Sequence, residues 1–457
     1  MHTIAAISTP KGNGGIGIVR VSGDNSLNIV NKIFVPYSRK NKSILDMPGY
    51  TAKLGKVVFK NETLDEAIVF VFRAPKSYTG EDVVEISCHG GLFVLDRVLD
   101  AVLSSGADLA MPGEFTKRAV LNGKMSIIQA ESVKDIIEAR SKNAARLALL
   151  NKDGVLNNRI FKIKKRLTYV LARISVGIDY PDDEDFSNID YSKIKEELLN
   201  ISKDMRNLLK TYEVGRIIKD GIDTVIVGKP NAGKSSLMNA LILKEKSIIT
   251  DIPGTTRDIV EETIFCDDLV LNLKDTAGIR NSENIIEKIG IEKSLEKIKE
   301  AELVLAVFDS SDKLSCEDKK ILDLLKEKEN VIGILNKSDL PQKIDIDHLK
   351  KVIKNLISIS AKKNIGIEEL KKIIKKISYN DISDPERGIL TTKRQFVSLE
   401  KSLNHINNAV DQISANETDD IIMNSLDFSL EELLLLTGEK VSQAVTDEIF
   451  SKFCVGK

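Results

Sequence analysis

The sequence feature that most constrains how this chain folds is the glycine-rich segment Gly228-Lys-Pro-Asn-Ala-Gly-Lys-Ser235. It fits the pattern G-x-x-x-x-G-K-[ST], whose backbone N–H groups surround the phosphates of a nucleotide. Such a loop lies between a buried strand and the positively polarised end of a helix. We therefore predict a strand over 223–228, a helix over 236–243 and a nucleoside triphosphate site between them.

Individual residues of this loop and of the next motif have specific chemistry. Lys234 supplies positive charge to the β and γ phosphates, and the Ser235 hydroxyl is a ligand for Mg²⁺. The apolar alternation over 269–274 predicts a second strand, which leads into Asp275-Thr-Ala-Gly278. Asp275 can hold Mg²⁺ through water, and the Gly278 N–H can donate to the γ phosphate.

Two motifs further along the chain indicate the base of the nucleotide. A buried strand predicted over 331–335 leads into Asn336-Lys-Ser-Asp339. The Asp339 carboxylate can accept hydrogen bonds from N1 and N2 of guanine, a donor pair that adenine lacks. Backbone N–H groups of 360–362 can meet guanine O6. We therefore predict that the ligand is GTP, bound by motif residues Asn231, Ala232, Gly233, Lys234, Ser235, Ser236, Asp275, Thr276, Ala277, Gly278, Asn336, Lys337, Asp339, Ser360, Ala361 and Lys362.

Composition and charge limit which other kinds of protein this chain can be. The formal net charge of −1 gives no overall attraction to nucleic acid, so an RNA contact requires a local basic patch. The four cysteines lie far apart without a C-x-x-C pair, so they indicate neither a disulfide framework nor a zinc site, which suits a reducing compartment. No signal peptide or membrane-spanning run is present. We predict a cytoplasmic protein.

The hydrophobic period changes along the chain. It alternates like strands over 16–21, 54–59, 67–72 and 83–87, with helical spacing over 92–104, and becomes helical between 112 and 212. Helical spacing resumes over 394–413 and from Leu430 onward. We predict an α+β domain (1–120), a helical bundle domain in two halves (121–219 and 379–457) and an inserted α/β P-loop GTPase domain of Ras-like fold (220–378).

Other segments carry a more specific resemblance. They are residues 9–20, 77–83, 88–91, 112–118, 129–131, 178–184 and the terminal Phe453-Cys-Val-Gly-Lys457. Together with the GTPase motifs, they make the whole chain similar to the family of tRNA-modifying GTPases called MnmE or TrmE. One departure is Leu390-Thr-Thr-Lys-Arg-Gln395, where relatives usually have Leu-Thr-Asn-x-Arg-His, so the start of that helix is expected to pack differently.

The resemblance implies a function. Members are homodimers, joined through an amino-terminal domain that binds a one-carbon tetrahydrofolate, and a heterotetramer with the FAD protein MnmG is expected. The two proteins add an aminomethyl or carboxymethylaminomethyl group to carbon five of the wobble uridine in certain tRNAs. GTP hydrolysis accompanies that chemistry and is stimulated by K⁺ when two GTPase domains meet.

The resemblance also implies residues for hydrolysis. K⁺ takes the place of an arginine finger, held by Asn231 and by backbone carbonyls at Thr250, Ile252 and Thr255. Thr256 is the expected second Mg²⁺ ligand. Because Ile279 stands where other GTPases have a catalytic glutamine, the water-orienting role maps to Glu287, which on composition alone is one of several solvated glutamates. The implied GTP-binding segment between the motifs comprises Thr250, Asp251, Ile252, Pro253, Gly254, Thr255 and Thr256.

A folate site needs an apolar or aromatic wall, ring hydrogen-bond partners and cations for the glutamate carboxylates. The candidates are Arg20, Tyr78, Lys124 and Lys457, with Arg73 and Arg118 in reserve, and each is equally compatible with a surface or core position. The family implies a catalytic role for Cys454, which its aromatic neighbours would present to the folate; an inert thiol is the alternative.

The basic run 159–173 is a candidate tRNA contact, although such runs are more often solvated helix faces. Another function also stays open. A ribosome-assembly or regulatory GTPase switch could share every nucleotide motif. It would lack the folate-like first domain and the terminal Cys-Val-Gly-Lys segment, and it would hydrolyse GTP slowly in any salt.

Overall fold

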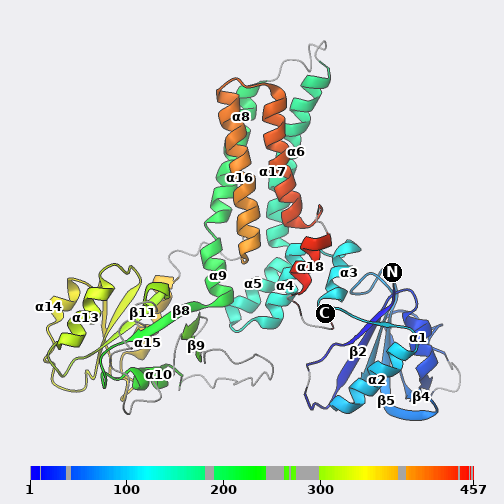
Figure 1. The fold of residues 1–457 in the computed structure, drawn as a ribbon, viewed down its shortest axis with the longest axis horizontal. Helices are drawn as coiled ribbons and strands as arrows, with labels where there is room; N and C mark the ends of the chain where they lie inside the picture. The colour runs from blue at the N-terminus through cyan, green and yellow to red at the C-terminus, as the bar shows by residue number, and fades with distance from the viewer. Residues whose placement is uncertain are drawn as a thin grey trace. The chain divides into compact units, whose positions relative to one another are not determined.

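The computed structural model describes residues 2–10, 12–37, 43–180, 190–242, 262–266, 269–273, 298–378, 388–440, 443–451, 453 and 456, and only the backbone at 242, 262, 378 and 443–446 (Figure 1). The chain forms two compact units. The first contains residues 1–134, 151–202 and 398–457, and the second contains 135–150 and 203–397. The predicted domain limits at 120, 219 and 378 stay predictions.

The first unit begins with a seven-stranded sheet in the order β3-β4-β5-β6-β2-β1-β7. Neighbouring strands are antiparallel except β1 and β7, which are parallel. The predicted strands and the helix over 92–104 are confirmed, with small shifts at the strand ends. The elements are β1 (Ile4–Ile7), β2 (Gly17–Ser22), α1 (Ser26–Ile33), β3 (Phe34–Pro36), β4 (Thr51–Phe59), β5 (Glu62–Phe72), β6 (Val83–Cys88), α2 (Leu92–Ser104) and β7 (Asp108–Leu109).

One face of this sheet is covered, and along β5 the other face is exposed. Along β5, Ala67, Val69 and Val71 are buried in a core shared with α1 and α2. The side chains between them point the other way, so Ile68 and Phe70 remain 40% and 37% exposed. This is the period-two pattern of a strand with one buried face. The apolar residues on its open face are unusual for that pattern.

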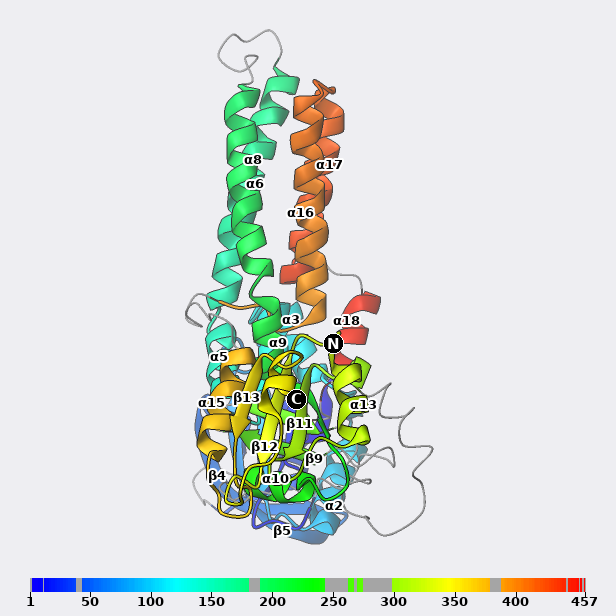
Figure 2. The same cartoon turned by 90° about the vertical axis from the view of Figure 1, so that its left-hand side faces the viewer.

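Long helices follow the sheet, as the change of period predicted (Figure 2). Helices α6 and α17 pack along each other. Between α16 and α17, the buried hydroxyls of Ser402 and Ser429 lie 2.8 Å apart. The helices are α3 (Glu114–Leu121), α4 (Ile127–Glu138), α5 (Lys142–Lys152), α6 (Val155–Asp179), α8 (Tyr191–Leu209), α9 (Tyr212–Asp220), α16 (Lys393–Ser414), α17 (Asp419–Thr437) and α18 (Gln443–Ser451).

Two details at the carboxyl-terminal helices differ from the sequence expectation. Helix α17 begins at Asp419 rather than near Leu430, with Asp419 and Asp420 in its first turn, where carboxylates are favoured by the helix dipole. It ends at Gly438, which has a φ of +91° and lies so close to Ile127 that a side chain would collide with it. A separate helix, α18, therefore follows instead of one continuous helix.

The departure at 390–395 forms a helix start. The buried Gln395 accepts a hydrogen bond from the Thr391 N–H at 2.9 Å, and the Gln395 N–H in turn bonds to the Thr392 hydroxyl. This reciprocal arrangement resembles a capping box and satisfies N–H groups at the beginning of α16. Gln395 thus fills its position with a side chain that caps the helix.

The second unit contains a six-stranded sheet in the order β13-β12-β11-β8-β10-β9. Its strands are parallel except for the β9–β10 pair. This mixed sheet confirms the predicted α/β GTPase fold. The elements are β8 (Ile222–Val227), α10 (Lys234–Ile242), β9 (Glu262–Cys266), β10 (Leu269–Leu273), β11 (Leu303–Asp309), α13 (Cys316–Leu325), β12 (Val331–Asn336), α14 (Ile346–Lys350), β13 (Asn355–Ser358) and α15 (Ile367–Ser378).

Helices cover both faces of this sheet, which explains why its central strands are apolar along most of their length. Along β11, Leu305 and Val307 pack with residues of α10 and α15. Ala306 and Phe308 point to the other face and pack with residues of α13 and α14. Helix α10 begins at Lys234, two residues before the expected start. Among the described residues, no helix is both long and apolar enough to cross a membrane.

Candidate nucleotide site and Arg20 cluster

The phosphate loop follows β8, where the sequence placed it, and its two glycines have no room for side chains. A Cβ added at Gly228 would lie 2.4 Å from the Val307 carbonyl oxygen. At Gly233, which has a φ of +99°, an added Cβ would lie 2.0 Å from Nδ2 of Asn336. Both glycines therefore let the loop pack directly against β11 and β12 while its N–H groups stay available for phosphate.

The loop is anchored at its start by Lys229. The Lys229 ammonium lies 3.1 Å from the carboxylate of Asp312 and 3.3 Å from that of Asp318. Asp318 is buried and caps α13 in a capping box with Ser315. Sequence reasoning missed this anchor, because position 229 is a wildcard in the motif. The start of the loop is thus tied to α13.

Lys234 lies at the first position of α10 and is oriented toward the loop. Its Nζ donates hydrogen bonds to the carbonyl oxygens of Gly228 at 2.8 Å and of Lys229 at 3.0 Å. Burial lowers the pKa of the Lys234 ammonium. A partly desolvated cation held inside the curve of the loop is well placed to meet a phosphate, because its charge is weakly screened there.

Asn336 connects the phosphate loop to the segment predicted to meet guanine O6. Its side chain is 3% exposed. Nδ2 donates to the carbonyl oxygen of Ala232 at 2.9 Å, and Oδ1 accepts from the Ala361 N–H at 3.0 Å. The structure thus gives Asn336 a positioning contact with two predicted binding segments.

Asp339 lies in the same region. Its Oδ1 accepts a hydrogen bond from the Ser360 hydroxyl at 2.7 Å, and Lys363 lies 3.6 Å from Oδ2. The Ser360 hydrogen bond is the main reason that the pKa of Asp339 is lowered. The carboxylate therefore stays ionised and keeps acceptor capacity for a base. Lys337 donates to Asp309 at 2.6 Å, which holds the end of β11 beside the loop.

The structure places the remaining motif residues of the loop as follows. Asn231 is exposed and has a φ of +62°, the left-handed conformation that Asn tolerates better than most residues. Ser235 and Ser236 are exposed in the first turn of α10, and Lys362 is exposed beside Ala361. Outside the described residues lie Thr250, Asp251, Ile252, Pro253, Gly254, Thr255, Thr256, Asp275, Thr276, Ala277, Gly278, Glu287, Cys454 and Lys457.

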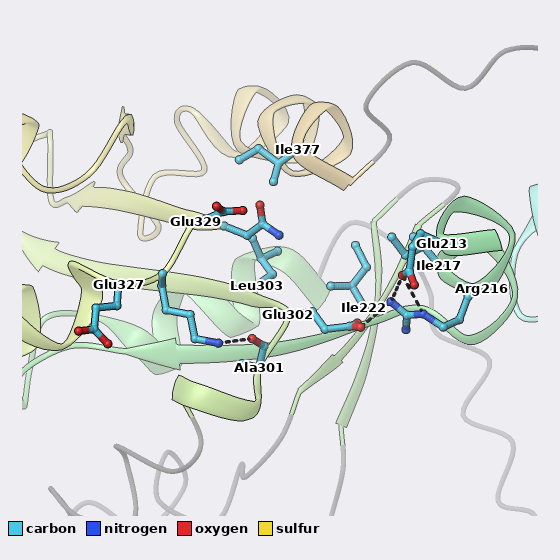
Figure 3. A pocket seen from close by; sticks show the side chains of 12 residues that line it. Glu213, Arg216, Ile217, Ile222, Ala301, Glu302, Leu303, Glu327, Glu329 and Ile377 are labelled. Atoms are coloured by element: carbon cyan, nitrogen blue, oxygen red, sulfur yellow. Dashed lines mark hydrogen bonds and ion pairs between the residues drawn. The ribbon is translucent and has the colours of Figure 1, made fainter. Parts of the chain in front are cut away.

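A cavity of about 510 Å³ lies elsewhere in the second unit (Figure 3). It is lined by Ile222 and Leu303, the first residues of β8 and β11. The phosphate loop follows the opposite end of β8, so this cavity is not the nucleotide site. At its edge Arg216 of α9 contacts Glu302 at 2.5 Å and Glu213 at 3.2 Å, which ties α9 to the sheet.

In the first unit, Arg20 is the centre of a cluster formed by Tyr78, Glu85, Phe115, Thr116 and Gly456. The Arg20 guanidinium contacts the Glu85 carboxylate at 2.8 Å and lies 5.6 Å from the ring centres of Tyr78 and Phe115. The Tyr78 hydroxyl lies 2.9 Å from that of Thr116, and burial raises the pKa of Tyr78. Aromatic rings, a cation and hydroxyls therefore meet here.

The Arg20 cluster also includes the carboxyl-terminal tail. The Gly456 carbonyl oxygen accepts hydrogen bonds from Arg20 at 3.2 Å and from the Ser8 hydroxyl at 3.0 Å. An added Cβ at Gly456 would lie 2.3 Å from the Ile7 carbonyl oxygen. Phe450 and Phe453 of the same tail pack together with Ala130.

The other folate candidates lie differently. Lys124 is exposed and donates to the Pro75 carbonyl oxygen at 2.9 Å. Arg118 is buried between Glu81 and Glu114, and Arg73 bonds the Met47 carbonyl oxygen and Asp82. Both reserve arginines thus have structural partners. The sequence did not identify Glu85 as a partner of Arg20, because the two residues meet only through the register of β2 and β6.

The cysteines and histidines form no metal site among the residues that the structure describes. Cys88 and Cys266 are buried, and Cys316 is exposed at the start of α13. Burial raises the pKa of Cys88 to about 11, so its thiol is unreactive at neutral pH.

Comparison with known proteins gives the family. A model of the GTP-binding protein TrmE amino terminus matches residues 3–124, and a model of the MnmE helical domain matches 127–454. The solved G domain of the T. maritima FeoB iron transporter is 28% identical, covering 34% of this chain and 98% of that one. Its TM-score of 0.26 is too low to support a statement about the fold.

Full-length relatives carry the name tRNA modification GTPase MnmE. The protein of Carboxydothermus hydrogenoformans is 42% identical over 461 residues, which cover 100% of this chain and 99% of the relative. That of Thermoanaerobacter pseudethanolicus is 43% identical over 460 residues, and that of Clostridioides difficile is 40% identical over 458, with the same coverage. The chain therefore belongs to the MnmE family of tRNA modification GTPases.

Proposed function

We propose that this chain is a K⁺-stimulated GTP hydrolase that works with the FAD protein MnmG on tRNA. The pair would use a one-carbon tetrahydrofolate to add an aminomethyl or carboxymethylaminomethyl group to carbon five of the wobble uridine in certain tRNAs. The observation that carries the GTPase part is the Asn336 bridge between the phosphate loop and the predicted guanine segment. Family membership carries the tRNA part.

The residues present fit GTP and its metal ions. The glycine cradle leaves N–H groups for the phosphates, and Lys234 supplies a half-buried cation. Ser235, at the first turn of α10, is the proposed Mg²⁺ ligand, with Thr256 and, through water, Asp275. When bound, Mg²⁺ and K⁺ supply positive charge to the phosphates as the bond to the γ phosphate breaks. Glu287 is the residue proposed to orient the attacking water.

For K⁺ the proposed side-chain ligand is Asn231, together with carbonyl groups of Thr250, Ile252 and Thr255. Asn231 is exposed and its backbone is left-handed, so its amide oxygen is free to meet solvent or a second GTPase domain. An amide oxygen is a hard donor of the kind that alkali cations prefer. This donor supports K⁺ dependence without any rearrangement of the buried loop residues.

The Arg20 cluster supports a folate site. Tyr78 and Phe115 supply an aromatic wall, the Arg20 guanidinium supplies charge, and Thr116 supplies a hydroxyl. These are the groups that a pteridine with a glutamate tail requires. The tail segment that reaches this cluster through Gly456 also contains Cys454 and Lys457, and we propose that both contact the folate, with Lys124 as a more distant cation.

A homodimer through the amino-terminal domain is supported by the open face of its sheet. Leu54 and Ile68 are directly opposite each other in the β4–β5 register and are 49% and 40% exposed, and Phe70 lies two residues along. A sheet face with contiguous apolar side chains needs a partner surface. A second copy of this domain, and a heterotetramer with MnmG, are the proposed assemblies.

The first experiment measures GTP hydrolysis in KCl and in NaCl at matched ionic strength. We expect faster turnover in KCl, and loss of that difference in Asn231→Ala. Asn416→Ala is the matched control, because Asn416 is also exposed and left-handed, with a φ of +53°, but lies in the turn before α17. Glu287→Ala should lower turnover in both salts.

The outcomes separate the candidate functions. Equal, slow hydrolysis in both salts would favour the regulatory or ribosome-assembly switch. Full turnover by Glu287→Ala would remove its water-orienting role. The folate part is tested separately by calorimetry with a tetrahydrofolate derivative on the dimeric protein. Absence of binding by folded wild-type protein would refute that part while leaving the GTPase proposal intact.

A further inference from the structure

Helix α6 is unusually basic. It carries six Lys or Arg residues, and its single acid, Asp179, is at its last position. Two of these cations are used inside the bundle. Lys164 contacts the Glu439 carboxylate at 2.5 Å, and Arg166 contacts Glu197 at 2.6 Å. The packing of the bundle therefore accounts for only part of the charge.

Three other cations of α6 lie on one exposed face with two aromatic rings. This α6 face consists of Phe161, Lys162, Lys165, Tyr169 and Arg173. At about 100° per residue these positions fall within roughly a third of the helix circumference and span about 18 Å along its axis. Within the described part of the chain, none of the three cations has an ion-pair partner. Phe161 is 51% exposed and Tyr169 is 64% exposed.

The other long helices of the bundle have no comparable face. Helix α17 contains five acids and no Lys or Arg. The exposed charges of α8 and α16 alternate in sign, with Lys193, Glu196, Lys203, Asp204 and Arg206 on α8 and Lys393, Glu400, Lys401 and Asp411 on α16. An all-positive face that also exposes aromatic rings is thus confined to α6, and general solubility does not require it.

We propose that the α6 face binds the phosphate backbone and an unpaired base of a tRNA loop. This inference rests on the proposed function, because it assigns a surface to that tRNA. Lys162, Lys165 and Arg173 meet phosphates, where their charges release condensed counterions. The Tyr169 ring, and the Phe161 ring about two turns away on the same face, offer flat surfaces on which a base stacks.

The combination selects RNA over a protein partner. A protein interface of this size would place its apolar residues in a centre depleted of charge. On the α6 face, by contrast, Lys162 and Lys165 lie between the two rings and Arg173 lies one turn beyond Tyr169. Alternating cations and rings suit single-stranded nucleic acid, whose phosphates and bases alternate along the chain.

The test measures affinity for an unmodified tRNA transcript, and for its isolated anticodon stem–loop, by fluorescence anisotropy over a range of salt concentrations. The variant Lys162→Gln/Lys165→Gln/Arg173→Gln should bind more weakly and lose about two to three from the slope of log K against log salt. Tyr169→Ala should weaken loop binding about tenfold with an unchanged slope, and should not affect a perfect RNA duplex. Tyr169→Phe should retain affinity.

Lys193→Gln/Lys203→Gln/Lys210→Gln is the matched control, because it removes three exposed cations at or near α8. The proposal would be overturned if this control weakened tRNA binding as much as the α6 variants do. It would also be overturned if the α6 variants kept the wild-type tRNA affinity and the wild-type slope of log K against log salt. Loss of tRNA modification with unchanged tRNA affinity would assign the face to a protein and also overturn it. If wild-type protein with normal GTP hydrolysis bound no tRNA, the tRNA part of the proposed function would fail as well.

Discussion

Asn336 joins the phosphate loop to the segment at Ala361 through two hydrogen bonds of its side chain, and a substitution at Asn336 tests this bridge. Asn336→Ala removes both the donor to the Ala232 carbonyl and the acceptor for the Ala361 N–H. Both partner groups lie at buried residues, Ala232 at 0% and Ala361 at 7% exposure. The variant therefore leaves one backbone acceptor and one backbone donor without their partner, while the small side chain itself is easily accommodated.

The magnitude follows from those two groups. An unsatisfied buried donor or acceptor costs about 1–3 kcal/mol, and water entering the space recovers part of that. We expect the ordered conformation of the phosphate loop to become less stable by about 2–4 kcal/mol. Since nucleotide binding must then order the loop, the Kd for a fluorescent GDP analogue should rise about 30- to 700-fold, at 1.4 kcal/mol per factor of ten.

The assay combines that binding measurement with hydrogen exchange of the β8 and β12 amides. Hydrogen exchange is preferable to a single melting temperature, because a chain with two compact units does not unfold in one step. Asn330→Ala, an exposed change in the same unit, should leave both measurements within about 0.5 kcal/mol of wild type. GDP affinity within twofold of wild type in Asn336→Ala would refute the bridging role.

Asp339→Asn should reduce GTP affinity by at least about 100-fold and favour xanthosine triphosphate, as competition binding would reveal, since two charge-assisted hydrogen bonds are lost. Gly456→Ala would force a Cβ against the Ile7 carbonyl oxygen, so calorimetry should show about tenfold weaker folate binding at unchanged GTP hydrolysis. His89 bonds Asp65 at 2.7 Å, which raises its pKa, so the pair stabilises the fold below pH 6.5 and stops doing so as pH rises through the raised pKa. NMR titration should place the His89 midpoint above 6.5, and Asp65→Asn should lower it.

The sequence predicted helices and strands well where the period of its apolar residues matches the side chains that are buried. The helix over 92–104 and the strands that precede the phosphate loop and Asn336 follow directly from apolar period and glycine placement. The predicted start of α17 was wrong because the first turn of the helix begins with two acids and only its later turns are continuously apolar. The acids of that first turn were the available signal.

Long-range partners could not be predicted from sequence. Nothing near Arg118 in the chain shows that Glu81 holds it, and nothing near position 229 shows that Asp318 anchors the loop. Register places Glu85 beside Arg20, and register depends on the whole sheet rather than on either strand. The motifs therefore locate the candidate sites, and only the fold reveals the residues that position them.

The hydrogen bond from Arg20 to Gly456 also has a consequence for how the protein is made. These partners lie 436 residues apart. At about 5–20 residues per second, a ribosome produces Gly456 roughly 20 to 90 seconds after Arg20. The amino-terminal sheet has ample time to form before then, but its Arg20 cluster stays incomplete. A nascent chain thus acquires the complete cluster only after the GTPase unit has been synthesised.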